Sequence, residues 1–247
     1  MVTWFITGAS RGFGALVVER ALAKGDAVVA TARNPQAVLD RFGRIDILLN
    51  NAGFGLMGAV EEASATEIEA VYRTNVFGLL TVTRAVLPPM REARSGRILN
   101  ISSIGGYRGA AGFGIYSSTK FAVEGLSEAL HDELAPLGIH VTVVEPGYFR
   151  TDFLDASSLS VSATRIADYD ATAGKVRTVA TGLSHNQPGN PEKLADVLSA
   201  FVDAPNPPVR LPLGSDTVAA IERKHEADRA IVAEWRTVSV STDFVAA

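Results

Sequence analysis

The sequence contains no cysteine, and this absence removes three kinds of chemistry. A chain without thiols has no disulfide bond, no thiolate metal site and no cysteine nucleophile, and its redox compartment stays open. Metal-binding spacing is also missing among the four histidines, His131, His140, His185 and His225, so no metal site is expected.

Long runs of one kind of residue are missing as well. The net charge is −4 and no basic cluster occurs, which argues against binding to nucleic acid or to anionic membranes. No stretch approaches the ~18 apolar residues that a membrane-spanning helix needs. The N-terminus lacks a basic segment followed by a long apolar core, so we expect no signal peptide and a cytoplasmic location. The expected partner is a small-molecule substrate.

What the sequence does contain is an alternation of short apolar runs with longer amphipathic ones. Runs rich in β-branched residues predict strands at 2–7, 27–32, 44–50, 96–102, 140–146 and 209–213. Helical periodicity predicts helices at about 12–24, 35–43, 64–91, 116–136, 190–203 and 215–235. Strands that are apolar on both faces and separated by helices predict an α/β fold with a doubly wound parallel sheet, Rossmann-like, in a single domain over 1–247.

Residues 148–191 have no clear period and are rich in Ser, Thr, Ala and Gly. Long connections inside a compact domain are usually lids or binding loops. Because this segment follows the end of a predicted strand, we expect a flexible loop on the substrate side.

The stretch TGASRGFG at 7–14 fits two incompatible chemistries. Ser10 has the G-x-S-x-G spacing of a hydrolase nucleophile elbow, whereas Gly8, Gly12 and Gly14 fit a turn that lets phosphates approach the backbone. An elbow needs strands and an upstream loop before it, and only one strand precedes Ser10. The glycine turn has its required context, because a strand precedes it and a helix follows whose N-terminus favours pyrophosphate.

Tyr116 and Lys120 are four residues apart at the start of a predicted helix, so both project from one face. A neighbouring ammonium favours the phenolate and lowers its pKa, which makes Tyr116 a usable acid or base. The S-x-x-K spacing that ends at Lys120 also occurs in penicillin-binding serine enzymes, but the K-T-G and S-D-N strings of those enzymes are missing. The mixed-charge run at 222–229 is interpreted as the solvated face of a helix.

Six motifs occur together in one order: Gly-x-x-x-Gly-x-Gly after Thr7, NNAG at 50–53, Asn75 in TNVFG, Ser103 in NISSIGG, YSSTK at 116–120 and PGYFRT at 146–151. Together they cover about residues 2–152 and resemble the short-chain dehydrogenase/reductase family. The resemblance implies an oxidoreductase that moves hydride between a nicotinamide cofactor and a carbonyl or secondary alcohol.

The resemblance also implies the roles of single residues. Tyr116 transfers the proton, Ser103 hydrogen-bonds the substrate oxygen, Lys120 also holds the nicotinamide ribose, and Asn75 supports a water that relays protons to Lys120. Cofactor binding is expected at Gly8, Ser10, Arg11, Gly12, Phe13, Gly14, Arg33, Asn51, Ala52, Gly53, Tyr116, Lys120, Pro146, Gly147, Phe149 and Thr151.

The cofactor is expected to be NADP(H). About twenty residues after the glycine turn, where NAD sites usually offer a carboxylate, this chain has Ala32 and Arg33. A guanidinium binds a 2′-phosphate that a carboxylate would repel. Arg11 supplies a second cation by resemblance to NADP-preferring relatives.

The chain departs from the family between the strands predicted at 27–32 and 44–50. The family normally places a helix, a third strand and another helix there, about thirty residues more than this sequence has, although a dozen residues can still join parallel strands. Either a deletion leaves strand 27–32 at the sheet edge, or a flexible segment is missing from the sequence. Both explanations put the adenine pocket in question, because the third strand normally contributes to it.

The substrate is expected to be hydrophobic, with Ile104, Tyr107, Phe113, Tyr148 and Phe153 as candidates for an apolar wall. The resemblance implies a homodimer or homotetramer through the helices at 64–91 and 116–136. Two other functions remain open: a nucleotide-sensing or scaffolding protein, and a non-redox isomerase or cyclase that uses Tyr116 and Lys120.

Overall fold

The computed structural model describes residues 1–30 and 40–244 of the protein. Within these residues the main sheet is parallel and has six strands in the order β2-β1-β3-β5-β6-β8. Each strand overlaps one predicted range: β1 (Thr3–Ile6), β2 (Ala27–Ala30), β3 (Ile47–Asn50), β5 (Gly96–Ile101), β6 (Ile139–Pro146) and β8 (Arg210–Leu213).

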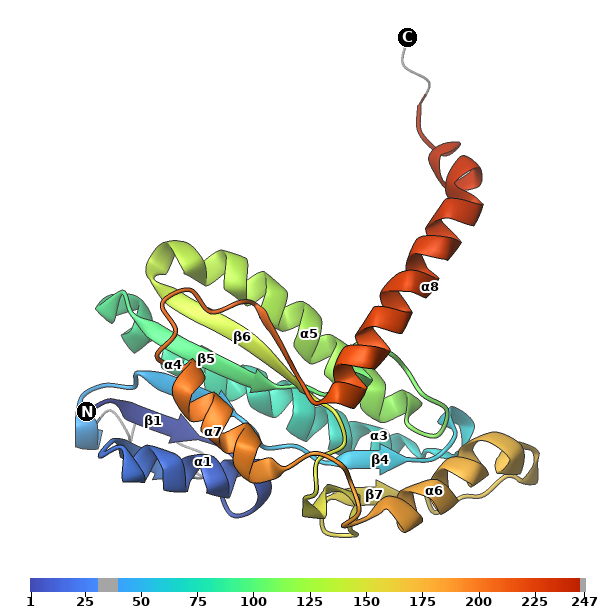
Figure 1. The fold of residues 1–247 in the computed structure, drawn as a ribbon, viewed down its shortest axis with the longest axis horizontal. Coiled ribbons are helices and arrows are strands. Elements are labelled where there is room, and N and C mark those ends of the chain that lie inside the picture. The colour runs from blue at the N-terminus through green and yellow to red at the C-terminus, as the bar shows by residue number, and fades with distance from the viewer. Residues whose placement is uncertain (31–39, 245–247) are drawn as a thin grey trace.

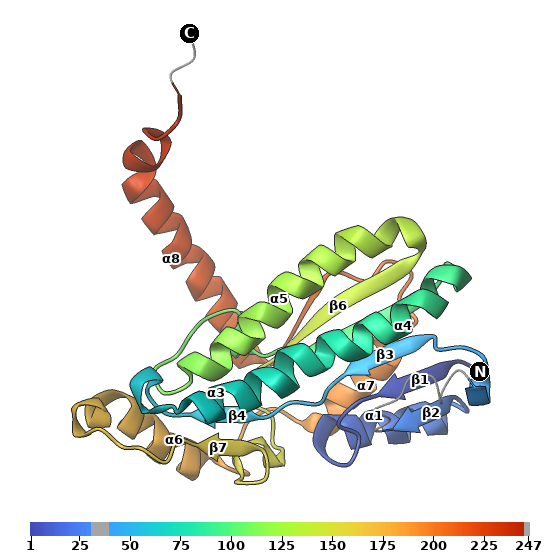
Figure 2. The same ribbon diagram turned by 180° about the vertical axis from the view of Figure 1, so that it is seen from behind.

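Helices cover both faces of this sheet (Figures 1 and 2). One face carries α1 and α7, which pack side by side, and the other carries α4 and α5. The bounds of these helices are α1 (Gly12–Ala23), α4 (Leu79–Ala93), α5 (Gly114–Leu134) and α7 (Pro191–Phe201). The predicted doubly wound α/β fold is confirmed.

The core explains why the strands are apolar on both faces. Successive side chains of a strand point to opposite sides. In β1, Trp4 and Ile6 pack in the cluster that contains α1 and α7, while Phe5 packs in the cluster that contains α4 and α5. All three side chains are fully buried, so a polar residue at any of them would face one helical layer or the other.

The helix predicted at 64–91 has a local irregularity. It consists of α3 (Ala65–Tyr72), a π-helical turn (Arg73–Gly78) and then α4. Ser64 caps α3, because its hydroxyl accepts a hydrogen bond from the Glu67 amide at 3.3 Å. Single π-helical turns within longer helices often occur at functional sites, and this one contains Asn75.

The strand β2 lies at one edge of the sheet in the part of the chain that the structure describes. This agrees with the expected loss of the third strand. Arg33 and most of the helix predicted at 35–43 fall on residues 31–39, outside the described residues.

The segment 148–191 contains regular structure that its composition did not predict. Its strand β7 (Leu159–Val161) pairs in parallel with β4 (Gly55–Met57), and it ends in α6 (Lys175–Leu183). The carboxylate of Glu62 binds this segment, because it accepts a hydrogen bond from the Ile166 amide at 3.0 Å and forms an ion pair with Arg177. Strands of three residues are too short to produce a readable alternation.

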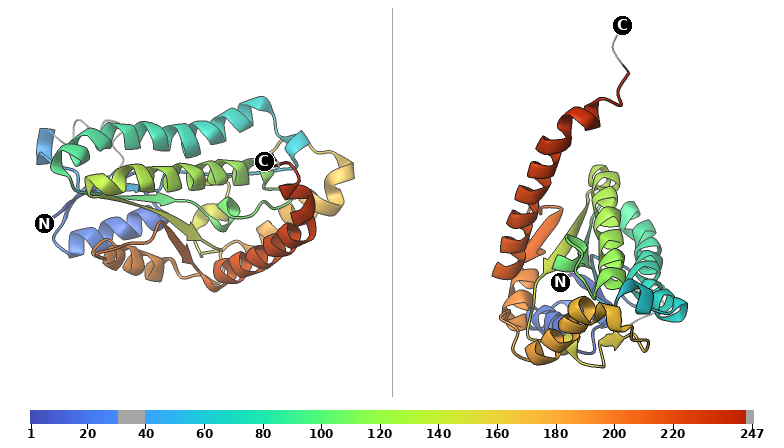
Figure 3. Two further views of the ribbon diagram at one scale, coloured as in Figure 1. Left: turned by 90° about the horizontal axis from the view of Figure 1, so that it is seen from above. Right: turned by 90° about the vertical axis from the view of Figure 1, so that its right-hand side faces the viewer.

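The last helix, α8 (Ser215–Val240), rises away from the rest of the molecule (Figures 1 and 3). Its N-terminal part packs beside β8, whereas Trp235 farther along is 55% exposed. No helix among the described residues is long and apolar enough to cross a membrane.

Candidate active site

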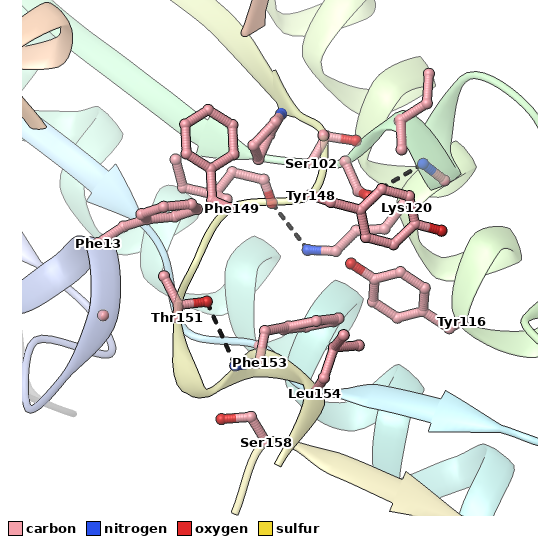
Figure 4. Close-up of a pocket in the computed structure, with 18 of the residues that line it drawn as sticks. Phe13, Ser102, Tyr116, Lys120, Tyr148, Phe149, Thr151, Phe153, Leu154 and Ser158 are labelled. Atoms are coloured by element: carbon pink, nitrogen blue, oxygen red, sulfur yellow. Dashed lines mark hydrogen bonds between the residues drawn. The ribbon is translucent and has the colours of Figure 1, made fainter. Parts of the chain in front are cut away.

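A cavity of about 440 Å³ opens at the carboxyl ends of the parallel strands. In open α/β sheets ligands bind in the crevice outside these strand ends. Its wall combines the turn after β1, the residues after β3 and β5, the start of α5 and the segment after β6. Figure 4 shows side chains from the start of α1, the end of β5, the start of α5 and the segment after β6 converging on one space.

The glycine turn after β1 forms one end of the cavity. Gly8 and Gly12 have φ values of +64° and +55°, which L side chains rarely adopt. A Cβ on Gly14 would lie 2.3 Å from the Gly8 carbonyl oxygen, so this position has no room for a side chain. Within the described part of the chain no side chain caps the N-terminus of α1, so its first amides are available to an anion.

The end of β3 holds this turn in place. Asn51 Nδ2 donates hydrogen bonds to the carbonyl oxygens of Thr7 at 3.2 Å and Gly8 at 2.8 Å. In return, the Thr7 hydroxyl accepts from the amides of Asn51 at 3.0 Å and Ala52 at 3.1 Å. The glycine turn and the NNAG motif therefore form one rigid unit.

Tyr116 and Lys120 lie in the first two turns of α5, and both are buried. Lys120 Nζ donates to the Ile101 carbonyl at 2.8 Å and lies 5.8 Å from the centre of the Tyr116 ring. Figure 4 shows both side chains directed into the same part of the cavity. Ser103 Oγ accepts from the Gly105 amide at 3.0 Å, which leaves its own hydrogen free for the Tyr116 oxygen or a substrate.

Burial controls the protonation of this pair. It raises the pKa of Tyr116, which a hydrogen bond from Ser103 opposes, and it lowers the pKa of Lys120 to about 8. The expectation that the ammonium would lower the pKa of Tyr116 is wrong for the cofactor-free protein, because desolvation of the phenol dominates. The resting Tyr116 is therefore protonated and can donate a proton.

Asn75 lies behind the cavity wall and does not line it. Its Nδ2 donates to the Phe54 carbonyl at 3.0 Å and to Thr119 Oγ1 at 3.1 Å, while its Oδ1 accepts from the Phe54 amide at 3.1 Å. A Cβ on Gly53 would be 3.1 Å from Asn75 Oδ1 and 3.6 Å from Lys120 Nζ. The side chain thus holds the chain after β3 against the helix that carries Lys120.

Aromatic side chains form much of the remaining wall. The Phe153 ring lies 5.6 Å from the Tyr116 ring, and Phe113 lies 6.1 Å from it on another side. At the glycine end, Phe13 and Phe149 meet edge to face at 5.4 Å. The wall around the Tyr116 ring is therefore largely aromatic.

The cavity contains most of the residues expected from the sequence: Gly8, Ser10, Arg11, Gly12, Phe13, Asn51, Ala52, Gly53, Ser103, Tyr116, Lys120, Pro146, Gly147, Phe149 and Thr151. Gly14 and Asn75 support it from behind. Ile104, Phe113, Tyr148 and Phe153 line it as expected, but the expectation for Tyr107 is wrong. The Tyr107 hydroxyl instead bonds His225 on α8, and the Arg210 guanidinium lies over its ring, so contacts outside the cavity hold this side chain.

Arg11 has a protein partner in the structure. Its guanidinium donates to the carbonyl oxygen of Ser157, in the segment after β6. This hydrogen bond connects the glycine turn to the substrate side of the cavity across an exposed surface.

Some lining residues were missed by the sequence interpretation, among them Ser102, Arg108, Gln187, Asp216, Ala220 and Arg223. Those on α8 carried no motif, and their position depends on how that helix packs. Glu124 was also missed, although it stands one helical turn after Lys120. It is buried beside Ser102, and this burial raises its own pKa to about 8. When Glu124 is ionised, its charge opposes the fall in the Lys120 pKa.

Comparison with known proteins identifies the family. Residues 35–160 match the family described as short chain dehydrogenase. An oxidoreductase of Botryotinia fuckeliana is 35% identical over 271 aligned positions, which cover 97% of this chain and 98% of the relative. A 3-ketodihydrosphingosine reductase of Bacteroides thetaiotaomicron is 37% identical over 234 aligned positions. These cover 85% of this chain and 86% of the relative.

Comparison with solved structures identifies the same family. A short-chain dehydrogenase from Streptomyces avermitilis superposes with a TM-score of 0.90 at 39% identity and covers 98% of this chain and 99% of that one. A short-chain dehydrogenase from Sphingobium yanoikuyae in complex with NADPH has a TM-score of 0.68 at 25% identity, with 94% and 96% covered.

The Botryotinia alignment has more positions than this chain has residues, so part of that relative has no counterpart here. The family match and the near-complete coverage of these relatives lead to one conclusion. The chain belongs to the short-chain dehydrogenase family and is a nicotinamide-dependent oxidoreductase.

Proposed function

We propose that the protein reduces the carbonyl group of a hydrophobic small molecule with NADPH. One observation carries the proposal: a protonated, buried Tyr116 shares a cavity with Ser103, Lys120 and a glycine turn suited to phosphates. Apolar and aromatic side chains around the Tyr116 hydroxyl support a hydrophobic substrate.

In this proposal the protein supplies the proton. The Tyr116 hydroxyl donates to the carbonyl oxygen while the Ser103 hydroxyl donates a hydrogen bond to the same oxygen, which holds it and stabilises its developing charge. Lys120, held by the Ile101 carbonyl, stabilises the phenolate that remains when its ammonium is charged. The contacts of Asn75 support a positioning role, and its part in a water relay stays a prediction.

The chain's own residues fit NADPH, which when bound supplies the hydride. The lack of space for a Cβ at Gly14 and the uncapped N-terminus of α1 suit a pyrophosphate. The NADPH complex of the Sphingobium relative supports the same cofactor here. Of the two candidate 2′-phosphate ligands, Arg11 would exchange the Ser157 carbonyl for the phosphate, and Arg33 lies outside the described residues.

The remaining expected cofactor contacts divide between the two ends of the cavity. We propose that Ser10, Gly12 and Phe13 bind the phosphates, that Ala52 and Gly53 lie beside the adenine-proximal ribose, and that the PGYFRT residues contact the nicotinamide. These last residues are Pro146, Gly147, Phe149 and Thr151. The segment 148–191 then forms the substrate-side wall.

Titration with NADPH and NADH, followed by protein fluorescence and by oxidation of NADPH with a panel of hydrophobic ketones, tests the function. We expect tighter binding of NADPH and turnover of at least one ketone. Arg33→Asp should lower the NADPH to NADH ratio of kcat/KM, because it replaces attraction to the 2′-phosphate by repulsion. An unchanged ratio assigns the phosphate to Arg11, and failure to bind either cofactor contradicts the function.

We also propose a homodimer through the helices expected at 64–91 and 116–136, which correspond to the stretch from α3 to α4 and to α5. Two aromatic side chains are exposed there, Phe77 at 58% in the π-helical turn that precedes α4 and Phe121 at 45% on α5. Large exposed apolar side chains that gather on one surface are typical of protein interfaces. A homotetramer and a cytoplasmic location stay predictions.

A further inference from the structure

The face of α8 nearest the body contributes to the cavity. Asp216, Ala220 and Arg223 all line it, and their spacing of four and three residues places them on one side of the helix. This part of α8 packs beside the turn Ile104–Gly106, which follows β5. The charged run at 222–229 is therefore not only a solvated face, since one of its arginines lines the cavity.

A second arginine reaches the cavity from the neighbouring loop. Arg108 lies two residues after that turn, and its side chain is exposed like that of Arg223. Neither guanidinium has a hydrogen bond or ion pair with any residue that the structure describes. Two cationic side chains from adjacent elements thus stand at the solvent edge of the cavity without a partner.

Three of the other charged side chains of the cavity already have a hydrogen-bond partner. Lys120 binds the Ile101 carbonyl, and Arg11 binds the Ser157 carbonyl at the glycine end. The Asp216 carboxylate accepts a hydrogen bond from the Tyr148 amide at 2.7 Å. The exposed Asp152 carboxylate lies in a cluster with Asp155 and His185, whose ligand atoms are within 4.8 Å. Among the residues that the structure describes, the two arginines are therefore the cationic side chains that the cavity has left for an anionic ligand.

Apolar residues near Arg108 in the chain line the same cavity. Ile104, Ala110 and Phe113 belong to the same connection between β5 and α5 as Arg108, and Tyr116 follows them at the start of α5. All of these residues line one cavity with the two arginines. A ligand with an apolar middle and a negative end can therefore contact the apolar side chains and the arginines together.

We propose that Arg108 and Arg223 form an anion-binding subsite, and that the substrate is an apolar carbonyl compound with a carboxylate or phosphate at the end remote from the carbonyl. The carbonyl part of this statement rests on the function proposed above, whereas the anion subsite does not. Guanidinium groups bind both anions through paired, charge-assisted hydrogen bonds.

Ligand binding tests the subsite without any turnover. Decanoate and its neutral analogue decanamide are titrated by calorimetry into protein saturated with NADP⁺, so that the cofactor's phosphate sites are filled. Wild type should bind decanoate about tenfold more tightly, a preference that weakens as salt increases. In the double variant Arg108→Gln/Arg223→Gln the two ligands should bind equally. Arg236→Gln, a matched change farther along α8, should keep the preference.

The proposal is overturned if wild type binds decanoate and decanamide equally. It is also overturned if the preference for decanoate survives in the double variant. Decyl phosphate, compared with decanoate, distinguishes the two anions: tighter binding of either one through the arginines assigns the substrate's anionic group. Reduction of a neutral hydrophobic ketone is measured in parallel on wild type and double variant. Loss of decanoate preference with ketone turnover retained supports the subsite, and absence of turnover in wild type contradicts the proposed function alone.

Discussion

At the scale of the residue, burial shifts the pKa values of Tyr116 and Lys120 in opposite directions. Burial disfavours the charged form of each, so it keeps Tyr116 protonated and brings the pKa of Lys120 down to about 8. The hydroxyl of Ser103 and the carboxylate of Glu124 oppose these shifts. The empty site is thus set to donate a proton.

Replacement of Tyr116 by phenylalanine tests the proton donor directly. Tyr116→Phe keeps the ring and its contacts with Phe113 and Phe153 but removes the hydroxyl. We expect kcat to fall about a hundredfold or more, with NADPH affinity changed only a few-fold. Ketone-dependent oxidation of NADPH and fluorescence titration measure the two quantities. Activity at a tenth of wild type or above would contradict the assignment.

The low pKa of Lys120 also predicts how stability depends on pH. The unfolded chain keeps the lysine proton up to about pH 10.5, whereas the folded cofactor-free protein loses it near pH 8. Between these values the unfolded state binds more protons, so stability rises with pH. The free energy of unfolding of wild type, relative to Lys120→Met, should increase by about 1 kcal/mol from pH 7 to pH 9. Urea denaturation at both pH values measures it, and a constant difference would rule out the burial penalty.

At the scale of the element, the turn between β1 and α1 depends on the absence of side chains. In Gly14→Ala the new Cβ would stand 2.3 Å from the Gly8 carbonyl oxygen and 2.6 Å from Asn51 Nδ2, so the turn has to shift. We expect NADPH to bind about tenfold more weakly, because a forced shift of this kind costs about 1–3 kcal/mol. Fluorescence titration with NADPH measures the affinity.

The matched control for this change lies in α5. Gly125 is exposed, and a Cβ there would meet nothing within 4 Å, so Gly125→Ala should leave cofactor affinity unchanged and raise stability by up to about 1 kcal/mol. Equal cofactor affinity in both alanine variants would show that the tight turn is not needed for binding.

At the scale of the whole molecule, the exposed aromatic side chains predict the assembly. If the stretch from α3 to α4 and the helix α5 form the dimer interface, Phe77→Lys/Phe121→Lys places charges in it and should yield a monomer in sedimentation velocity, with NADPH affinity retained. Trp235→Lys, on the projecting part of α8, is the control because this side chain is similarly exposed at 55%. A monomer produced by Trp235→Lys instead would move the interface to α8.

The amino-acid sequence by itself determined the layered α/β fold and most of the cavity. Strands such as β1 are apolar at every position because two helical layers cover the sheet, and this pattern is local. The glycine turn and the spacing of Tyr116 and Lys120 are local as well, and the carboxyl ends of parallel strands bring such motifs to one edge.

Tertiary structure decided the remainder, since it depends on contacts between distant segments. The pairing of β7 with β4 joins residues about a hundred positions apart, and neither short strand has a readable period. The wall from α8, which brings Arg223 to the cavity beside Arg108, follows from how that helix packs against the turn after β5. The pKa of Tyr116 also depends on the tertiary structure, because the burial of its phenol outweighs the effect of the nearby Lys120 charge.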